Sequence, residues 1–143
     1  MTATPQERNK IKITIKPPKL ADYQKAFLNC PQRFSVVEAS TKTGKTFSHI
    51  YWLFRLAHGL DPVWYTDNVK PGMNMWWVAP VYSQAKIAFA RMKRHILNAP
   101  GYKFNNSDLA ITTPKGTIIS FKSADTPDNL YGEDVYGVVF DEF

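Results

Sequence analysis

The sequence predicts an α/β fold in which a mainly parallel sheet is flanked by helices and carries an added β-hairpin. Three observations lead to this class: a loop rich in threonine and lysine between an apolar run and a helical pattern, further apolar runs separated by helical periodicity, and a late apolar run that ends in two carboxylates. Strands that alternate with helices form parallel sheets, because each return crossing uses a helix. With 143 residues and 44% hydrophobic residues, the chain is long enough to bury one core.

The expected elements follow from local pattern, taken in order. Isoleucines alternate with Lys and Thr at 11–16, which predicts an edge strand inside an N-terminal tail of residues 1–19. A short helix at 20–29 ends near a proline, and the apolar run at 34–39 predicts the first core strand. Apolar residues at helical spacing then predict a helix at 47–58, with Gly59 as its stop signal. We expect His49 and His58 on that helix to be structural.

The second half of the chain continues the alternation. An apolar run at 75–79 predicts a buried strand, and Ser83 is the expected N-cap of a helix that reaches Leu97. That helix should bury four apolar residues and turn its basic residues outward as candidate DNA contacts: Ala85, Phe89, Met92 and Ile96 inward, and Lys86, Arg91, Lys93 and Arg94 outward. A hairpin is expected over 109–113 and 117–122, followed by a loop at 125–134 and a buried strand at 135–140.

The composition excludes several classes of protein. An aromatic content of 14% excludes general disorder, and no apolar run approaches the roughly 18 residues of a membrane span. Cys30 is the only cysteine, which excludes an internal disulfide or a cysteine-based zinc site. The net charge of +6 favours an anionic partner. These properties suit a cytoplasmic protein with no membrane partner.

The most informative stretch is residues 39–46, ASTKTGKT, between the predicted strand and helix. It matches the phosphate-binding pattern G-x-x-x-x-G-K-[ST], except that Ala39 replaces the first glycine. Gly44 allows close backbone approach to phosphates, Lys45 spans the outer phosphates, and the Thr46 hydroxyl is a magnesium ligand. A surface turn before an amphipathic helix is the alternative interpretation.

Two carboxylates follow the last predicted strand. Ligands of open α/β sheets bind at the carboxyl ends of the strands, so Asp141 is placed to hold Mg²⁺ opposite Thr46. Glu142 is placed to orient, or take a proton from, the water that attacks the γ-phosphate. The alternative is a strand that simply ends in a polar pair at the surface.

Taken in order, these stretches resemble the N-terminal ATPase domain of a tailed-bacteriophage terminase large subunit. The resemblance is carried by residues 20–24 (LADYQ), 38–46 (EASTKTGKT), 77–86 (WVAPVYSQAK) and 123–142, which together span nearly the whole chain. It implies a RecA-like P-loop NTPase core over residues 20–143. It also implies more protein after Glu142, including the rest of the ATPase sheet and a nuclease domain, so that the chain would be a fragment truncated after the Walker B carboxylates.

The resemblance also implies roles for individual residues. Gln24 would read the adenine edge with Tyr23 packed beside it, and Glu142 would be the catalytic carboxylate. Lys42 stands where many relatives have an arginine that stabilises the transferring phosphate. The ATP-binding residues would be Tyr23, Gln24, Ser40, Thr41, Lys42, Thr43, Gly44, Lys45 and Thr46, with Thr46 and Asp141 as the Mg²⁺ ligands.

The implied function is ATP hydrolysis that drives viral DNA into a procapsid. The implied partners are double-stranded DNA, the portal, the small terminase subunit and further copies in a ring, at the procapsid portal in the host cytoplasm. Nuclease activity is not expected, nor is strong ATPase activity by this chain alone, because missing strands would leave sheet edges open. The alternatives are a helicase-like nucleic-acid-stimulated P-loop ATPase, or a non-catalytic remnant that binds DNA through its basic helix.

Overall fold

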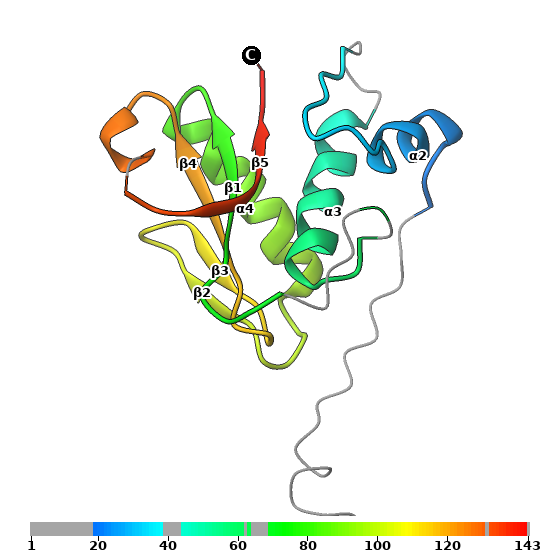
Figure 1. The fold of residues 1–143 in the computed structure, drawn as a ribbon. Helices are drawn as coiled ribbons and strands as arrows, with labels where there is room; N and C mark the ends of the chain where they lie inside the picture. Colours follow the sequence, from blue (N-terminus) through cyan, green and yellow to red (C-terminus); the bar gives the residue numbers. More distant parts are fainter. Residues whose placement is uncertain (1–18, 39–43, 62, 64–68, 131, 143) are drawn as a thin grey trace, which may run out of the picture.

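The protein is described by a computed structural model over residues 19–38, 44–61, 63, 69–130 and 132–142 (Figure 1). The elements are α2 (Asp22–Leu28), α3 (Lys45–Ala57), β1 (Asn74–Ala79), α4 (Tyr82–Ile96), β2 (Lys103–Asn105), β3 (Ala110–Thr112), β4 (Ile118–Ser123), the 3₁₀ turn η1 (Pro127–Leu130) and β5 (Val135–Phe140). Within these ranges no helix is both long enough and apolar enough to cross a bilayer. The predicted edge strand at 11–16 lies outside the described residues.

The strands form one five-stranded mixed sheet in the order β2-β3-β4-β1-β5. The strand β1 pairs in parallel with both β4 and β5, and this parallel core confirms the predicted strand–helix alternation. The predicted hairpin is also confirmed, because β3 pairs with β4 in antiparallel register. Its second strand pairs with β1 as well, so the hairpin is part of the sheet and extends it through β2, which was not predicted.

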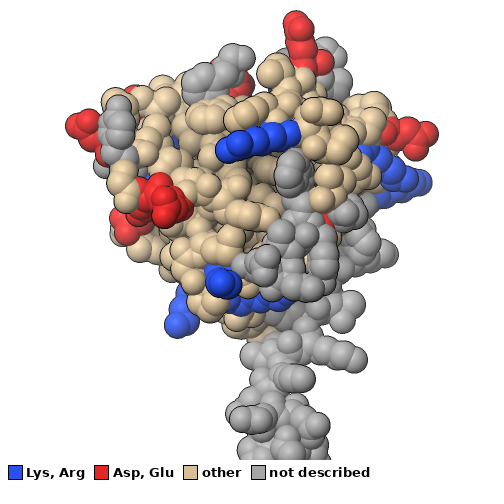
Figure 2. All heavy atoms as spheres, in the orientation of Figure 1, with Lys and Arg blue, Asp and Glu red and all other residues tan. Residues whose placement is uncertain are grey.

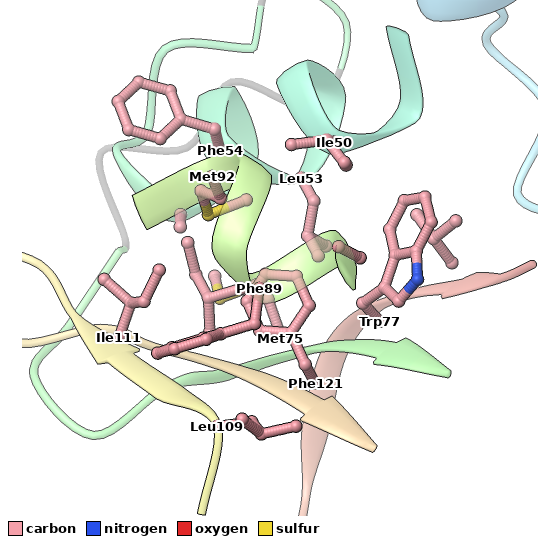
Figure 3. Packing of buried hydrophobic residues seen from close by; sticks show 14 of the residues in the cluster. Ile50, Leu53, Phe54, Met75, Trp77, Phe89, Met92, Leu109, Ile111 and Phe121 are labelled. Carbon is pink, nitrogen blue, oxygen red and sulfur yellow. The ribbon is translucent and has the colours of Figure 1, made fainter. Parts of the chain in front are cut away.

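The core lies between the sheet and the two long helices, α3 and α4, which pack on the same face (Figure 3). Leu53 of α3 and Trp77 of β1 are fully buried at its centre, and Phe89 of α4 meets Phe121 of β4 edge to face at 5.7 Å between ring centroids. All four apolar residues predicted for the inner side of α4 are buried, namely Ala85, Phe89, Met92 and Ile96. Helical spacing therefore located the core side of this helix correctly.

Two polar contacts fix the second half of α3. The Arg55 guanidinium pairs with the fully buried Asp61 carboxylate at 2.6 Å and also donates to the Leu28 carbonyl at the end of α2, at 3.3 Å. His58 is buried between the Phe54 carbonyl, at 2.7 Å from Nδ1, and the Tyr102 hydroxyl, at 2.5 Å from Nε2. Burial lowers the pKa of His58 below its ordinary value, so the ring is neutral and structural, as predicted.

The predicted first core strand at 34–39 is wrong over residues 34–38. These residues form no strand, and the side chains of Phe34 and Val36 are 83% and 96% exposed. Apolar character alone does not distinguish a strand from an exposed connection, because a strand also needs a neighbour that completes its hydrogen bonds. Residue 39 lies outside the described residues.

The strand β5 is less buried than its apolar sequence predicts. Among the described residues only β1 pairs with it, so β5 is an edge strand of the sheet, and Phe140 is 60% exposed. Another correction concerns α4, which begins at Tyr82 with Val81 as its N-cap. Ser83 lies inside the first turn and is therefore not the cap, because the extended backbone of Val81 already supplies the helix boundary.

On the face of the molecule seen in Figure 1, the described residues are mostly uncharged, as the same view in Figure 2 shows. On β1, Trp76 is 6% exposed, and the Lys122 ammonium of β4 lies 4.6 Å from its ring centroid. The carbon stem of a lysine covers apolar surface while its charged head stays in water. Lys122 thus helps to cover Trp76.

Candidate functional site

The start of α3 is built as an anion-binding helix terminus. Its N-cap is Gly44, which has a left-handed backbone with φ +77° and makes no side-chain capping bond. The first turn contains no acidic residue, so no carboxylate of that turn offsets the positive end of the helix dipole, toward which the first backbone N–H groups point. Lys45 and Thr46 are the first two residues of this helix, as the phosphate-loop pattern requires. The predicted ligands Ser40, Thr41, Lys42 and Thr43 lie outside the described residues.

The end of β5 carries the predicted metal carboxylate. The Asp141 amide donates to the Val78 carbonyl at 2.9 Å, so the ladder with β1 continues through the residue that follows the strand. Burial raises the pKa of Asp141, and the neighbouring Glu142 carboxylate raises it further. The positive charge of Lys45 acts in the opposite direction and lowers it.

That opposing effect links the two predicted halves of the site electrostatically. A lysine ammonium changes the pKa of a carboxyl only when the two groups lie close together, because intervening water screens their interaction. The start of α3 and the end of β5 lie at the same end of the molecule in Figure 1. Lys45 and Asp141, which are far apart in the sequence, therefore interact electrostatically at that end of the molecule.

Glu142 differs from its neighbour in both conformation and exposure. Its φ of +58° is left-handed, which is uncommon for any residue other than glycine. Asp141 is partly buried, whereas Glu142 is exposed. The two adjacent carboxylates thus occupy different environments, one held against the sheet and one open to water.

Gln24 and Tyr23, neighbours on the short helix α2, differ in their exposure to solvent. Tyr23 is 54% exposed, whereas Gln24 is buried at 8% exposure against the start of α3. The Gln24 side chain donates to the Gly44 carbonyl at 3.2 Å, so the residue does lie beside the phosphate loop. Its predicted contact with adenine stays a prediction.

Three further residues near the site were not predicted to belong there. Ser48 is fully buried one turn after Gly44, and its hydroxyl hydrogen-bonds both to Gln24 and to the Gly44 carbonyl. His49 and Arg91 each lower the pKa of Asp141 through their charge. A polar residue in the first turn of a phosphate-loop helix was a usable signal for Ser48, but Arg91 on α4 carries no local signal of that kind.

The donor set suits a hard divalent cation. A threonine hydroxyl and a carboxylate are oxygen ligands, and Mg²⁺ in nucleotide sites is held by one or two protein groups, phosphate oxygens and water. No cluster of three or more His, Cys, Asp or Glu side chains forms among the described residues. Thr46 and Asp141 therefore fit a magnesium ion that obtains most of its ligands from a nucleotide and from water.

A separate open cavity of about 590 Å³ lies at the other end of the sheet. It is lined by residues that precede β1 and β5 or begin these strands, among them Lys70, Asn74, Glu133 and Tyr136. It contains none of the predicted site residues. The candidate site and this cavity thus occupy opposite ends of the same two parallel strands.

Comparison with known proteins supports the fold. No protein-family model and no curated protein matches the chain. A solved structure of the large terminase ATPase domain of Thermus phage P74-26 is similar to it, with a TM-score of 0.50 and 25% sequence identity over 71% of this chain and 45% of that one. This chain has a terminase ATPase fold, which is RecA-like. A structure of the same domain with one arginine replaced by alanine is also similar, with 25% identity, the same coverage and a TM-score of 0.49.

The match covers only part of the relative. Since the aligned region spans 45% of that ATPase domain, the activity and partners of the whole domain are proposals for this chain.

Proposed function

We propose that this chain is the ATP-binding and ATP-hydrolysing part of a viral DNA-packaging motor. The proposal is supported by the electrostatic effect of Lys45, at the start of α3, on the pKa of Asp141, at the end of β5, in a fold shared with a phage terminase ATPase domain. These are the two places where such a fold binds a nucleotide. Its partners would be double-stranded DNA, the portal, the small terminase subunit and further copies of the chain in a ring, at the procapsid portal in the host cytoplasm.

Each side chain of the site has a defined task in hydrolysis. The first backbone N–H groups of α3 and the Lys45 ammonium bind the outer phosphates, which places the γ-phosphate at the end of β5. Thr46 and Asp141 would hold Mg²⁺, which neutralises phosphate charge when bound. Glu142, exposed beside them, would orient the attacking water and accept its proton as ADP and inorganic phosphate form.

Nucleotide binding by the intact chain tests the proposal directly. Isothermal titration with Mg·ATP is expected to show binding by the wild type and none by Lys45→Ala, because the charge that spans the phosphates is lost. Lys103→Ala is the matched control, since it removes the same charge from the exposed strand β2 outside the candidate site. Equal affinity of the wild type and Lys45→Ala would contradict the proposal.

The helix α4 favours DNA as a partner. None of its 15 residues is acidic, and Lys86, Arg91 and Arg94 are exposed on it. Lys93 instead lies 5.3 Å from the centroid of the Phe104 ring and donates to Asn106 at 2.8 Å. Since Arg91 acts on Asp141 at the candidate nucleotide site, Lys86 and Arg94 are the residues that we propose for phosphate contact with DNA.

Duplex DNA binding measured at several salt concentrations tests this surface. Each phosphate contact that is lost reduces the magnitude of the log–log salt slope by about 0.9. We expect that reduction for Lys86→Gln and again for Arg94→Gln, and no change for Lys103→Gln. The same titration with and without Mg·ATP separates a motor from a non-catalytic remnant, whose DNA affinity would not respond to nucleotide.

A further inference from the structure

The amide of Gln24 is fully engaged within the protein. Its Nε2 donates to the Ser48 hydroxyl at 2.9 Å and to the Gly44 carbonyl at 3.2 Å. Its Oε1 accepts the Ala21 amide at 2.8 Å, in the manner of a capping box at the start of α2. One buried side chain thus joins the first turns of two helices.

The orientation of this amide is fixed by its partners. Exchanging its nitrogen and oxygen would set Oε1 against the Gly44 carbonyl oxygen and leave the Ala21 N–H facing a donor. A side-chain amide has two N–H donors, and both are used here. Reading the edge of an adenine in a bidentate manner needs one N–H and the oxygen, so Gln24 has no donor left for it.

The bond to Gly44 controls the direction of a group that faces the phosphates. The Gly44 carbonyl also accepts the Ser48 amide at 3.0 Å and the Ser48 hydroxyl at 2.5 Å. That carbonyl and the Lys45 N–H belong to the same peptide plane and point in opposite directions. Holding the carbonyl toward Gln24 and Ser48 therefore aims the Lys45 N–H away from them, at the anion-binding side of the helix terminus.

The packing around Gly44 shows how closely Gln24 is seated. A Cβ atom added at Gly44 would lie 2.5 Å from Gln24 Nε2, closer than non-bonded atoms approach. Two features thus favour glycine at this position: the left-handed backbone conformation, and the Gln24 amide that leaves no room for a Cβ atom.

On these grounds, we propose that Gln24 is a positioning residue of the phosphate-binding terminus and does not select the nucleotide base. The proposal rests on the proposed function, since it concerns how the same site binds its ligand. It differs from the adenine contact that the sequence resemblance implies. Its consequence is that removing the Gln24 amide weakens binding of the phosphate chain itself, whether or not a base is attached.

The test compares two ligands that share a phosphate chain and differ in the base. Affinities of the intact chain for Mg·ATP and for Mg·tripolyphosphate are measured by titration for the wild type, Gln24→Ala and the control Lys25→Ala, an exposed neighbour on α2. We expect Gln24→Ala to lose about tenfold in affinity for both ligands, from two hydrogen bonds that no longer orient the Gly44–Lys45 peptide. Lys25→Ala should leave both affinities unchanged.

If circular dichroism shows that Gln24→Ala does not fold, a second variant keeps the test decisive. Ser48→Ala removes one partner of Gln24 and one donor to Gly44, and should lower both affinities by the same smaller factor. A loss confined to Mg·ATP, or no loss for either ligand, would overturn the inference and leave the proposed function standing. If the wild type binds neither ligand, the proposed function itself fails.

Discussion

Replacing Gly44 with alanine should destabilise the protein more than the same replacement at Gly72. Both glycines have a left-handed backbone, with φ +77° and +88°, so alanine costs about 1–2 kcal/mol of strain at either position. They differ in their surroundings, because a Cβ at Gly72 meets no atom within 4 Å, whereas at Gly44 it meets Gln24 Nε2 at 2.5 Å. Gly72→Ala is therefore a matched control for backbone strain and for the entropy of the unfolded chain.

The extra cost at Gly44 follows from the hydrogen bonds that the displaced amide loses. Gln24 Nε2 makes two of them, at 2.9 and 3.2 Å, and each contributes about 1 kcal/mol net. The difference between the two variants should thus be about 2 kcal/mol. For a urea slope of about 2 kcal/mol per molar, this moves the unfolding midpoint by about 1 M.

Urea unfolding followed by circular dichroism measures that difference. Equal midpoints for Gly44→Ala and Gly72→Ala would refute the argument that Gln24 is fastened to the start of α3. A second comparison isolates the contact: in a Gln24→Ala background the two alanine variants should converge, since the amide that collides with the new Cβ is gone.

Other positions give independent tests. Asp61→Asn should cost about 3–5 kcal/mol in urea unfolding, because it leaves the partly buried Arg55 guanidinium without its carboxylate, and a cost under about 1 kcal/mol would show that the pair is dispensable. Since burial lowers the pKa of His58, the unfolded chain binds more protons near pH 6, so stability should fall as pH drops below about 6.5. His58→Gln should flatten that pH profile. An unchanged slope of stability against pH would show that other groups cause the pH dependence. Gly137→Ala should cost about 1–3 kcal/mol, because its Cβ would overlap a methyl carbon of Leu56, and a thermal melt that matches the wild type would mean that β5 and α3 separate easily.

The parts of the fold that could be predicted from sequence are those whose signal is local. The helix α4 has apolar residues at helical spacing, and β1 is an apolar run of strand length, so both were located to within a residue or two. The segment 34–38 has the same apolar character as a strand but no partner among the described residues, and strand pairing is a property of the whole sheet.

In the candidate site, too, the features with a local sequence signal could be predicted and those that depend on packing could not. The pattern that ends at Thr46 and the carboxylate pair at Asp141 are short motifs, so sequence alone indicates the two halves of the site, and the charge of Lys45 in one half lowers the pKa of Asp141 in the other. The inward turn of Gln24 depends on how α2 packs against α3, through contacts with residues 20 and 24 positions away. The spacing of residues within a single helix cannot predict contacts between two helices.

The pairing of β5 with β1 has a consequence for the solvent exchange of backbone hydrogens in β5. The Asp141 N–H points toward β1, and because direction alternates along a strand, the Val139 N–H does so as well. In deuterium oxide the amides of Val139 and Asp141 would thus exchange slowly. The carboxylate end of the site is thus anchored to β1 through alternate residues of β5.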